Sequence, residues 1–439
     1  MKFHIEVYGC QMNVYDARRI SDTLVARSFE KASDATEADI LIFYTCNIRE
    51  RAVQKLFSNI GLLRNGNTKV IAVGGCVAQA EKQNIFKHKH IDIAFGAQTY
   101  HRLPEHIEDV LMRRRKQILD IGFDQAQKFE CLPERKDVSF SEFVTIQEGC
   151  DNFCTYCVVP YTRGREYSRP AKDIIDEVKL LLSHGAKEIT LIGQNVNSYH
   201  GEAPYISIGK PKETWRIERL IREIAELDGL RRLRYTTSHP KDFTTELMKV
   251  HADVPILVPF AHIPVQSGND RILKAMNRGH TAQEYMDKIA KFRDMCPQIQ
   301  FSSDFIVGFP TETEEEFVDT VKLAESVGYT ISFSFKYSRR KDTPADKMKG
   351  QISDEDKERR LAILQQALLK DQIRHNNALV GQTQEVLFER VGKKPNQYIG
   401  KNMYLQSVIV ESDVNLIGQF KNVKIETAGE NSVMGKVIG

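Results

Sequence analysis

Short apolar runs alternate with amphipathic helical patterns along most of this chain, and that alternation constrains its fold more than any other feature. In residues 1–115 the apolar runs at 2–9, 39–45, 68–75 and 91–96 are each followed by a helical pattern. Strands that alternate with helices are typical of a parallel sheet covered on both faces. We therefore expect an N-terminal α/β domain built on a Rossmann-like parallel sheet.

A second series of the same kind occupies residues 139–374. Its helices are well delimited: Pro170 precedes one and Gly185 follows it, while Thr313 and Glu316 form a capping-box pattern before another. Strands are expected at 143–147, 188–193, 233–238, 260–266, 299–309 and 329–337. These βα units predict a partial (β/α)6 barrel, with its active-site loops at the carboxyl ends of the strands.

The segments on either side of this series have a different character. Residues 116–138 follow the basic run at 113–116 and show little regular pattern, so we expect a linker there. Ser353 and Asp356 begin a further capped helix, and residues 375–439 then change to short β-type runs separated by turn residues. That last pattern predicts a small antiparallel β-barrel.

Composition narrows the classes of function. The net charge of the 439 residues is only +3, so overall basicity does not indicate nucleic-acid binding, although a local basic face can still exist. The N-terminal residues lack a signal-peptide pattern, and no stretch approaches the roughly 20 apolar residues of a membrane span. We expect a soluble cytoplasmic protein with no membrane partner, and nothing in the sequence demands more than a monomer. Eight cysteines in such a chain favour metal or redox chemistry over disulfides.

Three of these cysteines give the strongest chemical signal. Cys150, Cys154 and Cys157 have C-x3-C-x2-C spacing and directly follow the first strand of the second series. Three thiolates this close in sequence can bind one face of a 4Fe–4S cubane and leave its fourth iron without a protein ligand. A structural zinc would take a fourth protein ligand, and the nearest histidines, His184 and His200, lie further along the chain. The spacing favours a radical-SAM cluster over a structural zinc or inert thiols.

A second group of cysteines follows the strands of the N-terminal series. Cys10, Cys46 and Cys76 each lie at the carboxyl end of a predicted strand, just before the next helix. In an open parallel sheet those ends share one edge, where ligands bind, so we expect the three to meet in space. The alternative is that they are buried packing residues, a common role of cysteine. Cys131 and Cys296 have no partner by spacing, and we expect them to be bystanders.

At this point the sequence resembles a known family. The segment QEGCDNFCTYCVVPYTRGREYSRP at 147–170 is similar to the radical-SAM segment of the methylthiotransferases, especially the branch that acts on isopentenylated adenosine in tRNA. The resemblance covers essentially the whole chain, through YGCQMNVYD at 8–16, TCNIRERAVQK at 45–55, GGCVAQ at 74–79, TSHP at 237–240, HIPVQSG at 262–268 and DFIVGFPTET at 304–313. Ala17 and Arg18 stand where the family usually has Ser-Glu, and Tyr44 stands where it has Asn. These departures leave every candidate ligand in place but can alter packing around the second cysteine group.

The resemblance implies a methylthiotransferase N-terminal domain, a radical-SAM barrel and a C-terminal TRAM barrel that binds RNA. It also implies two 4Fe–4S clusters. The C-x3-C-x2-C cysteines would hold the first, whose open iron is chelated by S-adenosylmethionine (SAM), and the three strand-end cysteines would hold the second, which supplies sulfur. The implied reaction inserts sulfur at C2 of isopentenyl-adenosine at position 37, beside the tRNA anticodon, and then methylates it. SAM would serve as both radical source and methyl donor. Implied partners are the tRNA anticodon loop, a reductant such as flavodoxin or ferredoxin, and an Fe–S assembly or carrier protein.

Candidate SAM contacts lie in the cysteine loop and at the carboxyl ends of predicted barrel strands. Tyr156 resembles the aromatic residue beside adenine in radical-SAM enzymes. The strand end at 193–195 is where related enzymes bind the SAM amino group, although this sequence lacks their Gly-Gly-Glu. Residues 303–304 are candidates for the ribose and 307–309 for the adenine, with packing inside the barrel as the alternative. The full set is Tyr156, Gly193, Gln194, Asn195, Ser303, Asp304, Val307, Gly308 and Phe309.

Candidate RNA contacts fall into two groups. Three arginines follow the cysteine loop and would sit on the open face of the barrel, where they could meet phosphates or the SAM carboxylate; solvated arginines are the alternative. In the C-terminal barrel, lysines interleaved with tyrosines form the best candidate surface, because small barrels grip exposed bases by stacking and phosphate contacts. The residues are Arg163, Arg165, Arg169, Lys393, Lys394, Tyr398, Lys401 and Tyr404.

Three other functions remain open on sequence alone. A sister methylthiotransferase could act on threonylcarbamoyl-adenosine in tRNA, or on an aspartate of a ribosomal protein, and both would use the same cluster chemistry. A non-catalytic RNA-binding Fe–S protein is the third. The QMN after Cys10 and the segment DNFCTYCVVPYTRGREYSRP at 151–170 favour the isopentenyl-adenosine branch.

Overall fold

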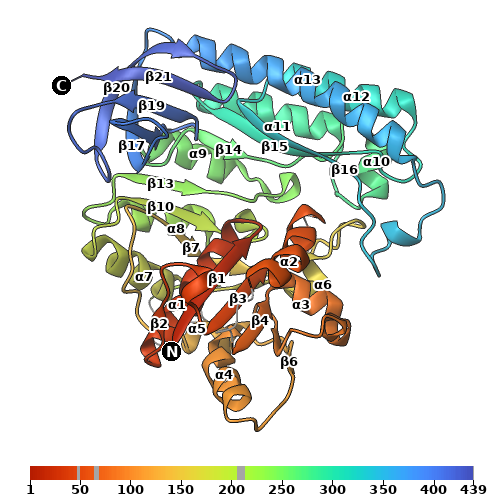
Figure 1. The fold of residues 1–439 in the computed structure, drawn as a ribbon. Coiled ribbons are helices and arrows are strands. Elements are labelled where there is room, and N and C mark those ends of the chain that lie inside the picture. Colours follow the sequence, from red (N-terminus) through yellow and green to blue (C-terminus); the bar gives the residue numbers. More distant parts are fainter. Residues whose placement is uncertain (47–49, 64–68, 205–212, 439) are drawn as a thin grey trace.

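The computed structural model describes residues 1–46, 50–63, 69–204 and 213–438 (Figure 1). Part of the motif at 45–55 and the first residue of the strand predicted at 68–75 lie outside the described residues. In the described part of the chain, no helix is long and apolar enough to cross a membrane.

The N-terminal domain is the predicted parallel sheet, with six strands in the order β2-β1-β3-β4-β5-β6. All of its strand pairings are parallel. The strands are β1 (Lys2–Tyr8), β2 (Glu30–Lys31), β3 (Ile40–Thr45), β4 (Val70–Gly74), β5 (Ile93–Phe95) and β6 (Ile118–Asp120). The helices are α1 (Gln11–Ala26), α2 (Glu50–Leu63), α3 (Cys76–Glu81) and α4 (Leu103–Leu111).

Alternate side chains of the central strands enter two separate cores. Ile40 and Ile42 of β3 pack with apolar residues of α1 and α4. Leu41 and Phe43 of the same strand pack with apolar residues of α2 and α3 on the opposite face. A strand buried on both faces reads as a continuous apolar run, which is why ILIFYT could be recognised in the sequence.

The segment at 116–138 differs from the expected linker. Residues 118–120 form β6, which pairs with β5 and closes one edge of the N-terminal sheet, and α5 (Gln125–Glu130) follows. Asp124 caps α5 by accepting a hydrogen bond from the Gln127 amide. This segment is therefore part of the packed structure.

All six predicted barrel strands are present. They form two parallel three-stranded sheets, β13-β10-β7 and β14-β15-β16, which a backbone bridge between Leu233 and Leu257 connects. The strands are β7 (Ser141–Thr145), β10 (Glu188–Ile192), β13 (Arg232–Tyr235), β14 (Phe260–His262), β15 (Gln300–Val307) and β16 (Ile331–Lys336). Short pieces are β8 (Gln147–Glu148), α6 (Val159–Thr162), β9 (Tyr167–Ser168), β11 (His200–Glu202) and β12 (Thr214–Arg216).

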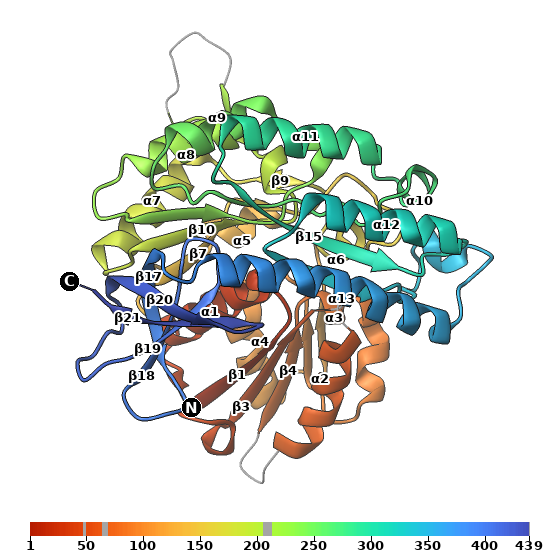
Figure 2. The same ribbon diagram turned by 90° about the horizontal axis from the view of Figure 1, so that it is seen from above.

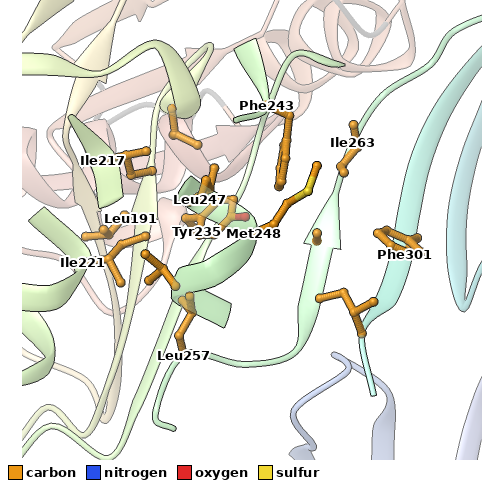
Figure 3. Packing of buried hydrophobic residues seen from close by; sticks show 14 of the residues in the cluster. Leu191, Ile217, Ile221, Tyr235, Phe243, Leu247, Met248, Leu257, Ile263 and Phe301 are labelled. Carbon is orange, nitrogen blue, oxygen red and sulfur yellow. The ribbon is translucent and has the colours of Figure 1, made fainter. Parts of the chain in front are cut away.

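Helices cover the outside of these sheets (Figure 2). They are α7 (Ala171–Ser183), α8 (Ile217–Ala225), α9 (Thr245–Asp253), α10 (Asp270–Ala275), α11 (Ala282–Met295), α12 (Glu314–Val327) and α13 (Asp354–Ala378). The predicted capping box at Thr313 and Glu316 is confirmed, and Ser353 caps α13. Between strands and helices lies one large apolar core, part of which Figure 3 shows: Tyr235 and Leu191 on strands face Ile221, Leu247 and other helix residues.

The C-terminal domain is a closed five-stranded barrel in the order β17-β18-β19-β21-β20. Its strands are β17 (Thr383–Val391), β18 (Gln397–Lys401), β19 (Ser407–Glu411), β20 (Phe420–Ala428) and β21 (Ser432–Val437). The expected antiparallel arrangement holds except for β19 and β21, which pair in parallel to close the barrel. Arg234 on β13 fastens this domain to the larger barrel by donating to the carbonyls of Asn402 and Met403, each at 2.7 Å.

Candidate active site

The C-x3-C-x2-C cysteines lie on a loop whose base is closed by the pairing of β8 with β9. The Cys150 amide donates to the Gly164 carbonyl at 3.2 Å. Gly149, at φ +79°, lies so close to the returning chain that a Cβ there would be 2.0 Å from the Arg165 carbonyl oxygen. The two ends of the loop are thus held together, and its three cysteines are presented above the carboxyl end of β7.

A segment at the end of α10 holds the middle of this cysteine loop. The Thr155 amide donates to the Met276 carbonyl at 3.0 Å, and the Thr155 hydroxyl donates to the Ala275 carbonyl at 2.8 Å. The Asn277 side chain donates to the carbonyls of residues 152–153 at 3.0 and 3.2 Å. These bonds fix the backbone between Cys150 and Cys157.

Arg278, which the sequence did not single out, points at the cysteine sulfurs. This buried guanidinium donates to Cys154 Sγ at 3.5 Å and to the Pro264 carbonyl at 2.5 Å. A charged N–H donor suits a thiolate better than a neutral thiol. No spacing rule could have found it, because 124 residues separate it from Cys154.

The sulfur donors of this loop fit an iron–sulfur cluster. Burial raises the pKa of the Cys157 thiol to about 12 and also raises the pKa of Cys150. A bound metal removes the proton of a coordinating thiol, so iron would keep these sulfurs as thiolates. Among residues the structure describes, no group of three or more His, Cys, Asp or Glu is arranged to hold a metal ion. The cluster assignment therefore rests on the donor set and its neighbours.

The strand-end cysteines lie at one edge of the N-terminal sheet, as their positions predict. The last pairs in the register are Tyr8 with Thr45 and Tyr44 with Gly74, so continuing it places Cys46 level with Cys76. Gly9 approaches so closely that a Cβ there would be 2.5 Å from Cys46 Cβ.

Cys10 follows at the start of α1. A hydrogen bond with the Cys46 side chain lowers the pKa of the Cys10 thiol to about 6, against the opposing effect of burial. Cys10 Sγ also lies 3.4 Å from Asn13 Oδ1. The structure thus places Cys46 next to Cys10 and level with Cys76 at one edge of the sheet.

Arg163 does not lie on the open face of the barrel, so its prediction as an RNA contact is wrong. Its buried guanidinium pairs with Asp16 at 2.8 Å and with Glu148 at 2.5 Å. Lys128, also buried, pairs with the same two carboxylates, and the Tyr44 hydroxyl donates to Asp16 at 2.9 Å. Tyr44, which stands where the family usually has Asn, therefore contributes a hydrogen bond to this buried charge network.

Arg169 is also buried, and its prediction as an RNA contact is wrong for the same reason. It donates to Glu177 at 2.7 Å and to the Thr145 carbonyl at 2.6 Å. Arg165 is exposed, with 77% of its side chain accessible, and lies over the Phe153 ring. Of the three arginines, only Arg165 is exposed, and its guanidinium lies 3.5 Å from the exposed carboxylate of Asp151.

The strand end at Gly193, Gln194 and Asn195 lies beside the cysteine loop. Gln147 Oε1 accepts the amides of Gln194 and Asn195 at 2.8 and 3.0 Å, and Gln194 Oε1 accepts the Gly149 amide at 2.6 Å. Asn195 Oδ1 is buried and has no hydrogen-bond partner among the described residues. This strand end therefore stays a candidate for a polar SAM contact.

The candidates on β15 divide between the two faces of the strand. The Ser303 hydroxyl is buried, donating to the Ile263 carbonyl and accepting the Val265 amide, and Val307 packs in the apolar core. The side chains of Ser303 and Val307 are therefore engaged inside the barrel wall, and the predicted contacts of these two residues with SAM stay predictions. Asp304, whose side chain is 31% exposed, lies on the other face.

The remaining candidates gather beside the cysteine loop. Phe309 is buried in a cluster with Met276, against which Tyr156 packs. The Gly308 amide donates to Glu312 at 2.6 Å. The structure thus brings Tyr156 and Phe309 to one apolar cluster, and their contacts with the SAM adenine stay predictions.

The lysine and tyrosine surface predicted on the C-terminal barrel does not form as one patch. Lys393 and Lys394 are exposed. Tyr398 packs against the barrel core. Lys401 Nζ donates to the Leu405 carbonyl and Ser407 hydroxyl, and the Tyr404 hydroxyl donates to the Gln298 carbonyl of the large barrel. The Lys401 side chain therefore bonds within its own barrel, and Tyr404 contacts the larger barrel.

Three family descriptions match successive parts of the chain. They are "Uncharacterized protein family UPF0004" at residues 2–96, "Radical SAM superfamily" at 144–324 and "TRAM domain" at 377–438. Among solved structures, the radical S-adenosylmethionine methyltransferase TsrM from Kitasatospora setae has a TM-score of 0.57 at 14% identity, covering 79% of this chain and 75% of that one. The cobalamin-dependent radical enzyme OxsB has a TM-score of 0.51 at 12% identity, covering 84% and 56%. These likenesses show the fold.

Curated relatives match over nearly their full lengths. Proteins from Zymomonas mobilis and Erythrobacter litoralis are 47% and 48% identical, each covering 99% of this chain, and 96% and 97% of their own lengths are covered. One from Agrobacterium fabrum is 45% identical over all of this chain and 98% of its own. All three carry the name tRNA-2-methylthio-N(6)-dimethylallyladenosine synthase.

The fold and the site define a radical-SAM methylthiotransferase with a TRAM domain. Sequence identity of 45–48% to the curated relatives, over nearly their full lengths, narrows this class to one family. The chain belongs to the family of tRNA-2-methylthio-N(6)-dimethylallyladenosine synthases.

Proposed function

We propose that this protein inserts sulfur at C2 of N6-dimethylallyladenosine at position 37 of tRNA and then methylates that sulfur. The proposal is supported above all by the path of one loop, residues 149–165. These residues hold the C-x3-C-x2-C cysteines and then reach the N-terminal domain, where Arg163 pairs with Asp16, six residues after Cys10. One continuous segment thus links a radical-generating site to a sulfur-donating site.

The chemistry explains why two sites are required. The C2–H bond of adenosine has no useful acidity, so general acid–base groups cannot easily activate it, and a cofactor must supply the hard step. When bound, the first cluster and SAM supply a carbon radical for that bond, and SAM also supplies the methyl group. Three sulfurs at each site would leave one iron of each cluster without a protein ligand. At the second site, that open position suits a transferable sulfide.

The residues of the chain hold these groups in place. Cys150, Cys154 and Cys157 would bind the first cluster, and the segment ending in Arg278 keeps their loop rigid. Cys10, Cys46 and Cys76 would bind the second. Gln147 fixes the strand end at 193–195 beside the first site, where it would meet SAM. Asp304 and Tyr156 remain the other SAM candidates.

We also propose the partners that this reaction requires. A low-potential reductant such as flavodoxin or ferredoxin would deliver electrons to the first site, and an Fe–S assembly or carrier protein would rebuild the second. The exposed Arg165, Lys393 and Lys394 are the candidates for phosphates of the tRNA anticodon loop. The protein would act as a monomer in the cytoplasm.

Anaerobic assays of a Cys46→Ala variant test whether the first site cleaves SAM and the second site donates sulfur. The reconstituted native protein, given SAM, a reductant and a dimethylallylated anticodon stem-loop, should release 5′-deoxyadenosine and form the methylthio nucleoside. Cys46→Ala should still cleave SAM and form no methylthio product. Cys131→Ala, which changes an exposed bystander thiol, is the matched control and should behave as native. Full methylthiolation by Cys46→Ala would contradict the sulfur-donor role of the second site.

A further inference from the structure

Two large apolar side chains are exposed on the edge strand β16. Phe333 is 48% exposed and Phe335 is 41% exposed. Helices α12 and α13 lie along one side of β15 and β16 (Figure 1), and Lys336 reaches Glu358 of α13 at 2.8 Å. Because side chains alternate along a strand, Phe333 and Phe335 face away from α13, toward the interior of the half-barrel.

The neighbours of these rings are set by the parallel register. Phe333 lies beside Asp304 of β15, and Phe335 lies beside Ile306. The ring of His262 on β14 is 6.4 Å from that of Phe333, centroid to centroid, and its Nε2 lies 3.6 Å from Asp304. One face of the sheet therefore carries a polar pair, Asp304 and His262, next to an apolar row.

This face is continuous with the cysteine loop. Ile306, next to Phe335, packs against the same apolar cluster as Tyr156. Tyr156 stands between Cys154 and Cys157 in the loop itself. A group lying on Phe335 would thus lie next to a residue of the apolar cluster against which Tyr156 of the cysteine loop also packs.

We infer that Phe333 and Phe335 bind the dimethylallyl group of the substrate adenosine and select the prenylated nucleoside; the inference rests on the proposed function. The dimethylallyl group is a branched hydrocarbon, and covering two exposed aromatic rings with it removes apolar surface from water on both sides. His262 beside the rings offers a hydrogen-bonding partner to the polar edge of the base.

The negative charge of threonylcarbamoyl-adenosine disfavours its binding at this face of the sheet. A threonylcarbamoyl group carries a carboxylate where the dimethylallyl group has only carbon. Placed on Phe333, that carboxylate would stand beside the carboxylate of Asp304, and like charges at such range repel. The carboxylate would also lose its hydrogen bonds to water, and the apolar rings could not replace them.

Binding of two matched RNAs tests this assignment. The probes are an anticodon stem-loop with N6-dimethylallyladenosine at position 37 and the same RNA with unmodified adenosine, each titrated into the full-length, anaerobically reconstituted protein with SAM. A hydrophobic site discriminates a single methylene by about tenfold or more, so the native protein should prefer the prenylated RNA by at least about tenfold. Phe333→Ala/Phe335→Ala should bind both RNAs equally.

Two further variants keep the result decisive. Phe333→Leu/Phe335→Leu retains an apolar face and should keep the preference, while Leu62→Ala removes an exposed apolar side chain on α2 and should change nothing. If the double alanine protein does not fold, the single variants Phe333→Ser and Phe335→Ser replace it, and each should lose part of the preference.

The outcomes separate the inference from the proposed function. A folded double alanine variant that keeps the native preference would overturn the inference and leave the proposed function standing. Equal loss of affinity for both RNAs would also overturn it, because the rings would then be a general stacking surface. A native protein that shows no preference and forms no methylthio product on the prenylated RNA would contradict the proposed function itself.

Discussion

Replacing Lys128 with methionine tests the buried charge network that joins the N-terminal domain to the barrel. The Lys128 ammonium is fully buried and donates to Asp16 at 3.2 Å and to the two oxygens of Glu148 at 2.9 and 2.8 Å. Arg163 pairs with the same carboxylates. Two cations therefore balance two anions in the protein interior.

The variant would leave one cation for two buried carboxylates. Methionine keeps most of the volume of the lysine stem, so the change removes charge more than packing. Removing one partner from a buried ion pair costs about 3–5 kcal/mol, because the remaining charge is left uncompensated. We expect the free energy of unfolding to fall by this amount, which is roughly two to three and a half powers of ten in the folding equilibrium.

Urea unfolding followed by circular dichroism and by the fluorescence of the single tryptophan, Trp215, measures the change. Lys172→Met breaks an exposed pair with Asp176 on α7 and should have no measurable effect. Adding Glu148→Gln to Lys128→Met leaves one cation with one anion, so the double variant should be more stable than Lys128→Met alone. A Lys128→Met protein as stable as the native one, or a double variant less stable than Lys128→Met, would show that the four charges do not compensate one another.

Two other predictions concern pH and reduction potential. His251 is buried between the Tyr235 hydroxyl at 2.8 Å and the Val258 carbonyl at 3.0 Å, and burial lowers its pKa to about 3. The unfolded chain binds this proton near pH 6.5, so stability should fall by about 1.4 kcal/mol per pH unit from pH 6.5 toward pH 3. Urea titrations at several pH values should show a shallower acid slope for His251→Gln, and an unchanged slope would contradict this. Arg278→Met should make the reduction potential of the first cluster more negative in a titration monitored by electron paramagnetic resonance, since hydrogen bonds to sulfur favour the reduced state; Arg165→Met should not, and equal potentials in all three proteins would rule out a tuning role.

Much of the fold could be predicted because local patterns and tertiary structure agree. Doubly buried strands such as β3 read as apolar runs, and helix caps such as Thr313 lie where the sequence signals them. The segment containing β6 and α5 could not be predicted. Its strand has only the residues Ile-Leu-Asp and depends on pairing with β5, which no local pattern encodes.

The residues of the candidate site also fall into those that the sequence could predict and those that it could not. The cysteines were predictable because strand ends in a parallel sheet meet at one edge. The arginines after the cysteine loop were not, because the side chains that bury them are distant in sequence. Arg163 pairs with Asp16, 147 residues away, and a basic residue looks solvent-exposed in sequence until such a partner is known.

Mass analysis of tRNA nucleosides from cells that lack the gene shows whether this protein converts N6-dimethylallyladenosine in tRNA to its 2-methylthio derivative. We expect the methylthio nucleoside to disappear and N6-dimethylallyladenosine to accumulate, and we expect the native gene, but not a Cys150→Ala version, to restore the product. Normal levels of the methylthio nucleoside in the deleted strain, with no second enzyme of this kind present, would show that this protein does not carry out the reaction.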